Sequence, residues 1–251
     1  MTAPRSAWLL EYQRAGGVDV IAGVLHRDDG LIEEGLRMFH FGLARQARNG
    51  SFPGSATPFH GTAMFLAEAA PALLVLKYSP LGHKYEAEIR WQVPRLRLAA
   101  RHLVRVVGGV GRIDDRTKNH RFYEAALALS STGVLAADRT LQDRAVRSAH
   151  EAIAMQRPNG VMPEDGGHDT GYQALGLVDA SRYLYLAPSG RLFRALYQAL
   201  RLGETWERSR IRSDGAINQS GDTRSYGCRE RDATGTCKTA FYATIFNALA
   251  P

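Results

Sequence analysis

A short Asn-Gly motif returns along the chain, and its spacing limits the folds that the sequence can adopt. The segment Gln46–Pro53 reads QARNGSFP, and Gln156–Pro163 repeats it as QRPNGVMP. A weaker copy, RSDGAIN over Arg212–Asn218, follows after half of that spacing. A further copy at the same shorter interval after the first would fall close to the stretch Gly108–Asp115. The sequence therefore predicts repeats of about 55 residues.

The hydrophobic pattern is helical almost throughout. Apolar residues in Leu31–Arg48 recur at the three- and four-residue spacing of a helix, and no segment shows the alternation of a strand. We expect Pro94 in the first turn of its helix, and Pro71 at a kink or near a helix start. The other predicted helices are Ser6–Leu25, weak and broken around Gly16–Gly17, then Gly61–Tyr78, Ile89–Val107, Tyr123–Leu135, Arg139–Gln156, Tyr172–Leu186, Arg191–Arg210 and Thr239–Leu249.

Glycine at each corner suits the end of a helix, where a residue in the left-handed conformation is common. A helical hairpin exposes an apolar face that it cannot bury alone, so neighbouring hairpins must stack. We therefore expect an all-α protein, a single domain over residues 1–251. About four stacked hairpins and an N-terminal helix would form an incomplete α/α toroid. The alternative is an irregular helical bundle whose loops share Asn-Gly turns.

Stacked hairpins place all their glycine-centred corners on one face, and polar residues are concentrated there. Three corners each deliver a histidine near a helix start, namely His60, His120 and His168. Any one of them could instead form a local hydrogen bond or cap. Carboxylates at the same places could simply be stabilised by the helix dipole. The coincidence of three histidines, with Asn, Tyr and Arg beside them, favours a functional site.

The charge of the chain favours an anionic partner. Thirty-two Lys and Arg residues face 25 Asp and Glu, a net charge of +7, and only four of the cations are lysines. Arginine binds carboxylate, phosphate and sulfate well, although solvated arginines would give the same count. The scarcity of lysine and the absence of a recognisable binding motif disfavour a nucleic-acid partner.

Composition narrows the class of protein further. With 251 residues, 45% of them hydrophobic, the chain can fold without a disulfide or metal. No apolar stretch reaches the ~18 residues of a membrane span, and we expect no membrane association. No signal-peptide pattern opens the sequence, so we expect a cytoplasmic protein, or a periplasmic or secreted one if a signal peptide has been removed. The oligomeric state is left open.

The two cysteines, Cys228 and Cys237, predict either free thiols or one local bridge. No cofactor is expected. The three corner histidines and the two cysteines could together bind zinc, but no local ligand spacing supports such a site.

Two segments resemble a known group of enzymes. Asn119–Ala126 (NHRFYEAA) and Gln156–Tyr172 (QRPNGVMPEDGGHDTGY) look like parts of the helical toroid domains of polysaccharide lyases of the alginate lyase and heparinase II/III type. At the level of pattern the resemblance covers roughly residues 30–190. Those families carry an Asn-His pair that opens an inner helix, with a histidine, a tyrosine and an arginine elsewhere around the cleft.

The resemblance implies β-elimination at a uronic acid of an anionic polysaccharide, and it assigns roles to the corner residues. His120 or His168 would remove the C5 proton, since histidine titrates near neutral pH. Tyr172 or Tyr226 would protonate the departing O4. Asn119 and Arg224 would hold the substrate carboxylate and stabilise the developing charge. The remaining substrate-binding candidates are His60, Arg121, Tyr123, Glu164 and Asp169.

Two other functions stay open. A glycoside hydrolase on the same toroid would use two carboxylates, with Glu164, Asp165, Asp169 and Asp115 as candidates. A non-catalytic module would use its basic face to bind an anionic partner.

Overall fold

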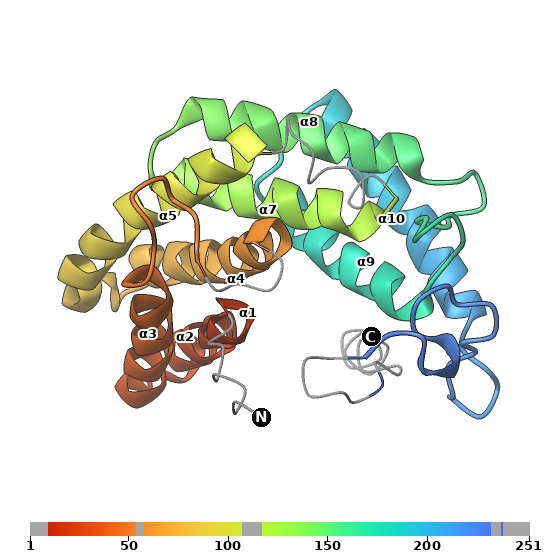
Figure 1. Ribbon diagram of the computed structural model, residues 1–251, viewed down its shortest axis with the longest axis horizontal. Helices are drawn as coiled ribbons and strands as arrows, with labels where there is room; N and C mark the ends of the chain where they lie inside the picture. The colour runs from red at the N-terminus through yellow and green to blue at the C-terminus, as the bar shows by residue number, and fades with distance from the viewer. Residues whose placement is uncertain (1–9, 54–57, 107–116, 232–236, 238–251) are drawn as a thin grey trace, which may run out of the picture. The chain divides into compact units, whose positions relative to one another are not determined.

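The computed structural model describes residues 10–53, 58–106, 117–231 and 237, and within them the protein is helical with no strand (Figure 1). The all-α class is therefore confirmed. The α-helices are α1 (Leu10–Gln13), α2 (Gly16–His26), α3 (Asp29–Leu43), α4 (Pro58–Tyr78), α5 (Glu86–Val106), α7 (Asn119–Leu135), α8 (Arg139–Met155), α9 (Thr170–Leu184) and α10 (Arg191–Ser209), with short 3-10 helices at Gly82–Tyr85 and Tyr226–Cys228.

The predicted repeat is visible in the positions of the helices. The helices that precede the predicted corners are α3, α5, α8 and α10, which begin at Asp29, Glu86, Arg139 and Arg191. The helices that follow the first three corners along the chain are α4, α7 and α9. The helix predicted after the fourth corner, Thr239–Leu249, lies outside the described residues. The starts of α3, α5, α8 and α10 are nearly evenly spaced, with a period close to the one expected from the Asn-Gly corners.

The chain divides into two compact units. The first comprises Met1–Arg112 and Leu127–Ala145, and the second comprises Ile113–Ala126 and Val146–Pro251. Helices α7 and α8 each begin in one unit and end in the other.

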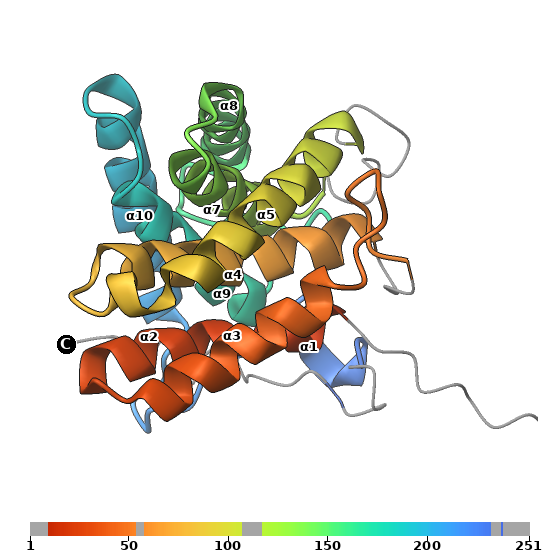
Figure 2. The ribbon, with the colours of Figure 1, turned by 90° about the vertical axis from the view of Figure 1, so that its left-hand side faces the viewer.

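Helix α4 forms the core of the first unit. It packs against α1, α2 and α5, and α2 also packs against α3 (Figure 2). The side chains of α4 are apolar on nearly all sides of the helix, and Phe65, Leu66 and Leu73 are fully buried. The segment Phe59–Tyr78 is also long and apolar enough to cross a membrane, a span that the sequence analysis did not anticipate, but 61% of it is buried inside the protein. Burial of this kind is typical of a helix that is hydrophobic all round in a globular core.

The prediction that Pro94 lies in the first turn of its helix is wrong. Helix α5 begins at Glu86, so Pro94 lies inside it, as Pro71 lies inside α4. Two acidic residues in the first turn, Glu86 and Glu88, favour this earlier start because they complement the helix dipole. Proline costs the helix one backbone hydrogen bond there.

Three corner loops lie within the described residues, and they share one backbone geometry; the corner expected near Gly108–Asp115 lies outside the described residues. Their glycines, Gly50, Gly160 and Gly215, have φ angles of 90°, 90° and 81°. In each loop the Asn or Asp side chain before the glycine accepts a hydrogen bond from the backbone N–H two residues further on. In each loop, too, a backbone N–H two residues before the Asn or Asp bonds the carbonyl on the far side of the glycine. The weaker third copy is therefore a genuine member of the repeat.

A glutamine ties the first two corners to the helix beyond. Gln46 Nε2 donates to the carbonyls of Gly50 (3.3 Å) and of Arg95 on α5 (2.9 Å). Gln156 Nε2 donates in the same way to Gly160 (3.1 Å) and to Ala199 on α10 (2.9 Å). The segments from α3 to α5 and from α8 to α10 thus each include a corner tied by a glutamine to a later helix.

Candidate functional site

Two loops of the second unit meet at the N-terminal ends of α7 and α9. The first loop follows the Gly160 corner, and the backbone N–H of Asn119 at the start of α7 donates to its Pro163 carbonyl (2.9 Å). The second loop follows α10, and Thr223 N donates to the carbonyl of His168 just before α9 (2.8 Å). The predicted residues of both loops and both helix starts are thereby brought together.

His120 and Glu164 form a buried dyad. The Nδ1 atom of His120 lies 2.6 Å from Glu164 Oε1, and both side chains are almost fully buried. A carboxylate beside Nδ1 fixes the proton on that nitrogen and orients the ring, which makes Nε2 the basic nitrogen. The backbone N–H of His120 also donates to Glu164 Oε1 (3.2 Å). Glu164 therefore positions both the ring and the first turn of α7.

Arg224 connects this dyad to a second carboxylate. Its Nη1 donates to Glu164 Oε2 (3.1 Å), while Nε and Nη2 donate to the two oxygens of Glu230 (3.0 and 3.1 Å). The guanidinium also lies 3.5 Å from the centre of the Tyr172 ring, and the Tyr172 hydroxyl donates to Glu230 Oε1 (3.0 Å). Burial disfavours the charge of Arg224, but Tyr172, Glu164 and Glu230 together raise its pKa above the ordinary value.

The aromatic ring of Tyr172 completes the group. It lies 4.8 Å from the ring of His120, centre to centre. A base, a phenol, a guanidinium and two carboxylates thus share one small volume in the second unit.

Asp169 holds this arrangement in place. Its Oδ1 caps α9 by accepting from Tyr172 N (3.1 Å), as the preference for Asp at this position predicts. Its Oδ2 accepts from the backbone N–H groups of Arg224 (3.0 Å) and Ser225 (2.8 Å) and from the Ser225 hydroxyl (3.0 Å). Asp169 is fully buried, and these contacts hold the second loop against α9.

His168 pairs with a different carboxylate. Its Nε2 lies 3.6 Å from Asp222 Oδ1, and its side chain is 27% exposed. Asp222 in turn accepts from Thr170 Oγ1 (2.9 Å), and burial raises its pKa above the ordinary value. Of the two histidines proposed as base, His120 is therefore the one locked beside Tyr172.

The other predicted site residues take different positions. Asn119 is fully buried and donates to the carbonyl of Ala152 (2.8 Å), and Tyr123 is fully buried in the core. Burial lowers the pKa of Arg121, which is partly exposed next to His120. Tyr226 is 47% exposed in the second loop. His60 lies at the start of α4 in the first unit, and Asp115 lies outside the described residues.

Cys228 and Cys237 form a disulfide, which selects the local bridge from the two options that the sequence left open. The bond engages both thiols, so the cysteines are no longer available as zinc ligands. It also closes a short loop that contains Glu230, the second carboxylate on Arg224.

The sequence analysis did not identify Glu230 and Glu207, two carboxylates of the second unit. Glu230 lies in a loop without helical periodicity and gives no signal in the sequence. Glu207 could have been found, because it continues the buried stripe of α10 formed by Leu192, Leu196, Ala199 and Gly203. Burial, followed by the nearby Asp222, raises the pKa of Glu207 to about 8.

This raised pKa predicts that stability depends on pH through Glu207. The folded protein keeps the proton up to about pH 8, whereas the unfolded chain releases it near the ordinary value of 4.5. Stability should therefore fall as pH rises through this window. Glu207→Gln should remove the dependence and become more stable than the parent at pH 8.5, by on the order of 2–4 kcal/mol. Melting temperatures at pH 5 and 8.5 measure this difference in stability, with Glu204→Gln, at a partly exposed position of the same helix, as control. Parallel pH profiles for the parent and Glu207→Gln would contradict the assignment.

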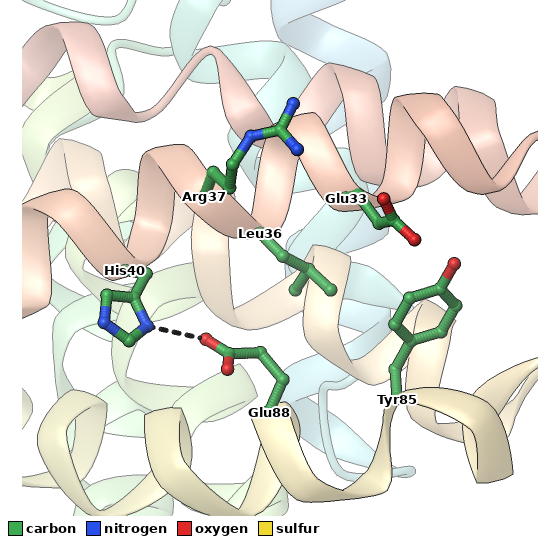
Figure 3. A pocket seen from close by; sticks show the side chains of 6 residues that line it. All are labelled: Glu33, Leu36, Arg37, His40, Tyr85 and Glu88. Carbon is green, nitrogen blue, oxygen red and sulfur yellow. Dashed lines mark hydrogen bonds and ion pairs between the residues drawn. The ribbon is translucent and has the colours of Figure 1, made fainter.

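The first unit contains a separate pocket of about 330 Å³ on α3 and α5 that the sequence analysis did not anticipate (Figure 3). His40 and Glu88 form a hydrogen bond at one side of it, with Nδ1 and Oε1 3.0 Å apart. The His40 ring stacks on Trp91 at 4.0 Å between centres. Tyr85 closes the other side, where its hydroxyl donates to Asp29 (2.6 Å). His40, Glu88 and Tyr85 thus already have hydrogen-bond partners at this pocket.

Comparison of the chain with protein-family models, with curated proteins and with solved structures finds no match in any of the three.

Proposed function

We propose that the protein is a polysaccharide lyase that cleaves a uronate-containing chain by β-elimination, with His120 as the base. The observation that carries the proposal is the buried contact of His120 Nδ1 with Glu164, beside Tyr172 and Arg224. A base for the weakly acidic C5 proton must be neutral and well oriented, and a carboxylate behind Nδ1 provides the orientation.

The carboxylate of Glu230 indicates how a substrate carboxylate would be held. Arg224 binds both of its oxygens through two nitrogens, and Tyr172 donates a third hydrogen bond. Paired N–H donors of this kind match the geometry of a planar carboxylate. In the proposed complex the uronate carboxylate displaces Glu230 and takes its place on Arg224. This assigns Glu230 the role of an internal competitor.

We assign each group one part in the proposed reaction. His120 Nε2 accepts the C5 proton, and the electron pair of the C–H bond moves toward the carboxylate that Arg224 neutralises. The C4–O4 bond breaks as the C4=C5 double bond forms. The Tyr172 hydroxyl, released from Glu230, donates its proton to the departing O4. Glu164 acts as a positioning residue, because it touches His120 and Arg224 but no reacting atom.

The arrangement of the hairpins is part of the same proposal. Hairpins that repeat at nearly even intervals, with matching corners, are typical of stacked α/α architectures. We propose that they form the incomplete α/α toroid expected from the sequence, with the polar corners around a cleft for the polysaccharide.

The test is a screen of the purified chain against uronate polysaccharides such as alginate, polygalacturonate and heparan sulfate. A lyase forms an unsaturated uronate that absorbs in the ultraviolet, and we expect this absorbance with at least one of them. Glu230→Gln should lower KM for that substrate several-fold, because it weakens the internal competitor, while Glu204→Gln, at a partly exposed position of α10, leaves KM unchanged.

New reducing ends without ultraviolet absorbance would identify a glycoside hydrolase instead. Salt-sensitive binding without any product would identify a binding module. Either result would overturn the proposed reaction.

A further inference from the structure

A pocket of about 270 Å³ in the first unit is lined by cationic side chains. It lies where α5 meets the start of α8, and its lining includes Arg101, Arg105, Asp138 and Thr140. All of these residues belong to the first unit. None of them takes part in the site described above.

The charges around this pocket do not balance. Asp138 Oδ2 accepts from Arg97 Nε (2.8 Å) and from Arg101 Nε (3.0 Å), so one buried carboxylate serves two guanidinium groups. A third, Arg105, stands one turn beyond Arg101 and donates to the backbone carbonyl of Asn49 (2.6 Å). In the described part of the chain no carboxylate pairs with Arg105. Three cations thus share one anion.

The cations are also held in place and accessible. Asp138 is 4% exposed, so it anchors Arg97 and Arg101, whose side chains remain 41% and 49% exposed. Arg105 and the hydroxyl-bearing Thr140 are exposed on the same pocket. Fixed guanidinium groups beside a hydroxyl donor are the usual receptor for an oxyanion.

We propose that this pocket is a binding site for the carboxylate of an acidic sugar residue, held by Arg101, Arg105 and Thr140. The identity of the ligand as a sugar acid rests on the proposed function, whereas the oxyanion chemistry rests on the arginines alone. The first unit would then bind an anionic sugar chain through this site, whether or not the chain is cleaved.

The test follows backbone amide signals near the pocket, those of Val104 and Leu141, by NMR during titration with sodium glucuronate, sodium sulfate or glucose. Glucuronate carries no sugar at O4, so the experiment does not depend on turnover, and its outcome is separate from that of the lyase assay. We expect glucuronate to shift these signals and glucose to leave them unchanged.

Arg105→Gln should weaken glucuronate binding about tenfold, because it removes one charged hydrogen-bonding partner while the contacts between Asp138 and Arg97 and Arg101 remain. Arg90→Gln is the matched control on the same helix, since Arg90 is 73% exposed and pairs with Glu86. An unchanged affinity in a normally folded Arg105→Gln protein would overturn the site. Shifts with sulfate but not with glucuronate would overturn its assignment to acidic sugars.

Discussion

Replacing His120 by glutamine should reduce kcat for the proposed elimination by about 10²- to 10⁴-fold, the usual contribution of a general base. Glutamine is similar in size and polar, so it can keep a hydrogen bond to Glu164 without accepting the C5 proton. The initial rate of ultraviolet product formation on the substrate found in the screen measures the effect. His168→Gln is the matched control, because His168 pairs with Asp222 and should lose only a few-fold.

A buried histidine also supports the fold, so a second variant separates chemistry from stability. His120→Ala removes the ring, and added imidazole should restore part of the activity if Nε2 is the base. A correctly folded His120→Gln protein with nearly full activity would contradict the assignment. So would a His168→Gln protein that is inactive while its melting temperature is unchanged.

Replacing Gly160 by alanine should cost about 3 kcal/mol of folding free energy or more. With a φ of 90° the residue is in a region that costs an L-residue about 1–2 kcal/mol, and an added Cβ would also collide with the backbone carbonyl of Leu202 on α10. Because the obstacle is backbone, a rotamer change cannot relieve it. Denaturant unfolding followed by circular dichroism measures the loss.

Gly215 provides the matched control for this experiment. It has a φ of 81° in the third corner, but an added Cβ there would meet no atom within 4 Å. Gly215→Ala should therefore lose only the part of the folding free energy that comes from the backbone conformation, about 1–2 kcal/mol. Equal losses in the two variants would show that the close approach of Gly160 to Leu202 contributes nothing to stability.

The repeat could be predicted from the sequence because its cause is local. Apolar periodicity and the Asn-Gly corners depend on neighbours a few residues away, and the helix ranges around α7 to α10 agree with the predicted ones to within four residues at each end. The position of Pro94 was mispredicted because the acidic first turn at Glu86 and Glu88 favours an earlier helix start than the rule for proline implies.

The candidate site was predicted only in part, since its contacts join distant segments. His120, Glu164, Tyr172 and Arg224 were selected individually, and the structure places them in one cluster. The role of each residue within the cluster was not predictable. Whether a carboxylate positions a histidine or binds a substrate depends on distances of a few tenths of an ångström across segments 44 to 60 residues apart. Glu230 was missed because nothing local marks it.

The three described corners share their backbone geometry but carry different side chains. The backbone bonds around Gly50, Gly160 and Gly215 are the same, yet the residue four positions after each glycine is Gly54, Glu164 and Gln219. Only the second copy carries the carboxylate that meets His120. Side chains at this position can thus be exchanged, by evolution or by design, without a change in the backbone of the turn. A new function can then arise at one corner while the other corners keep their structural role.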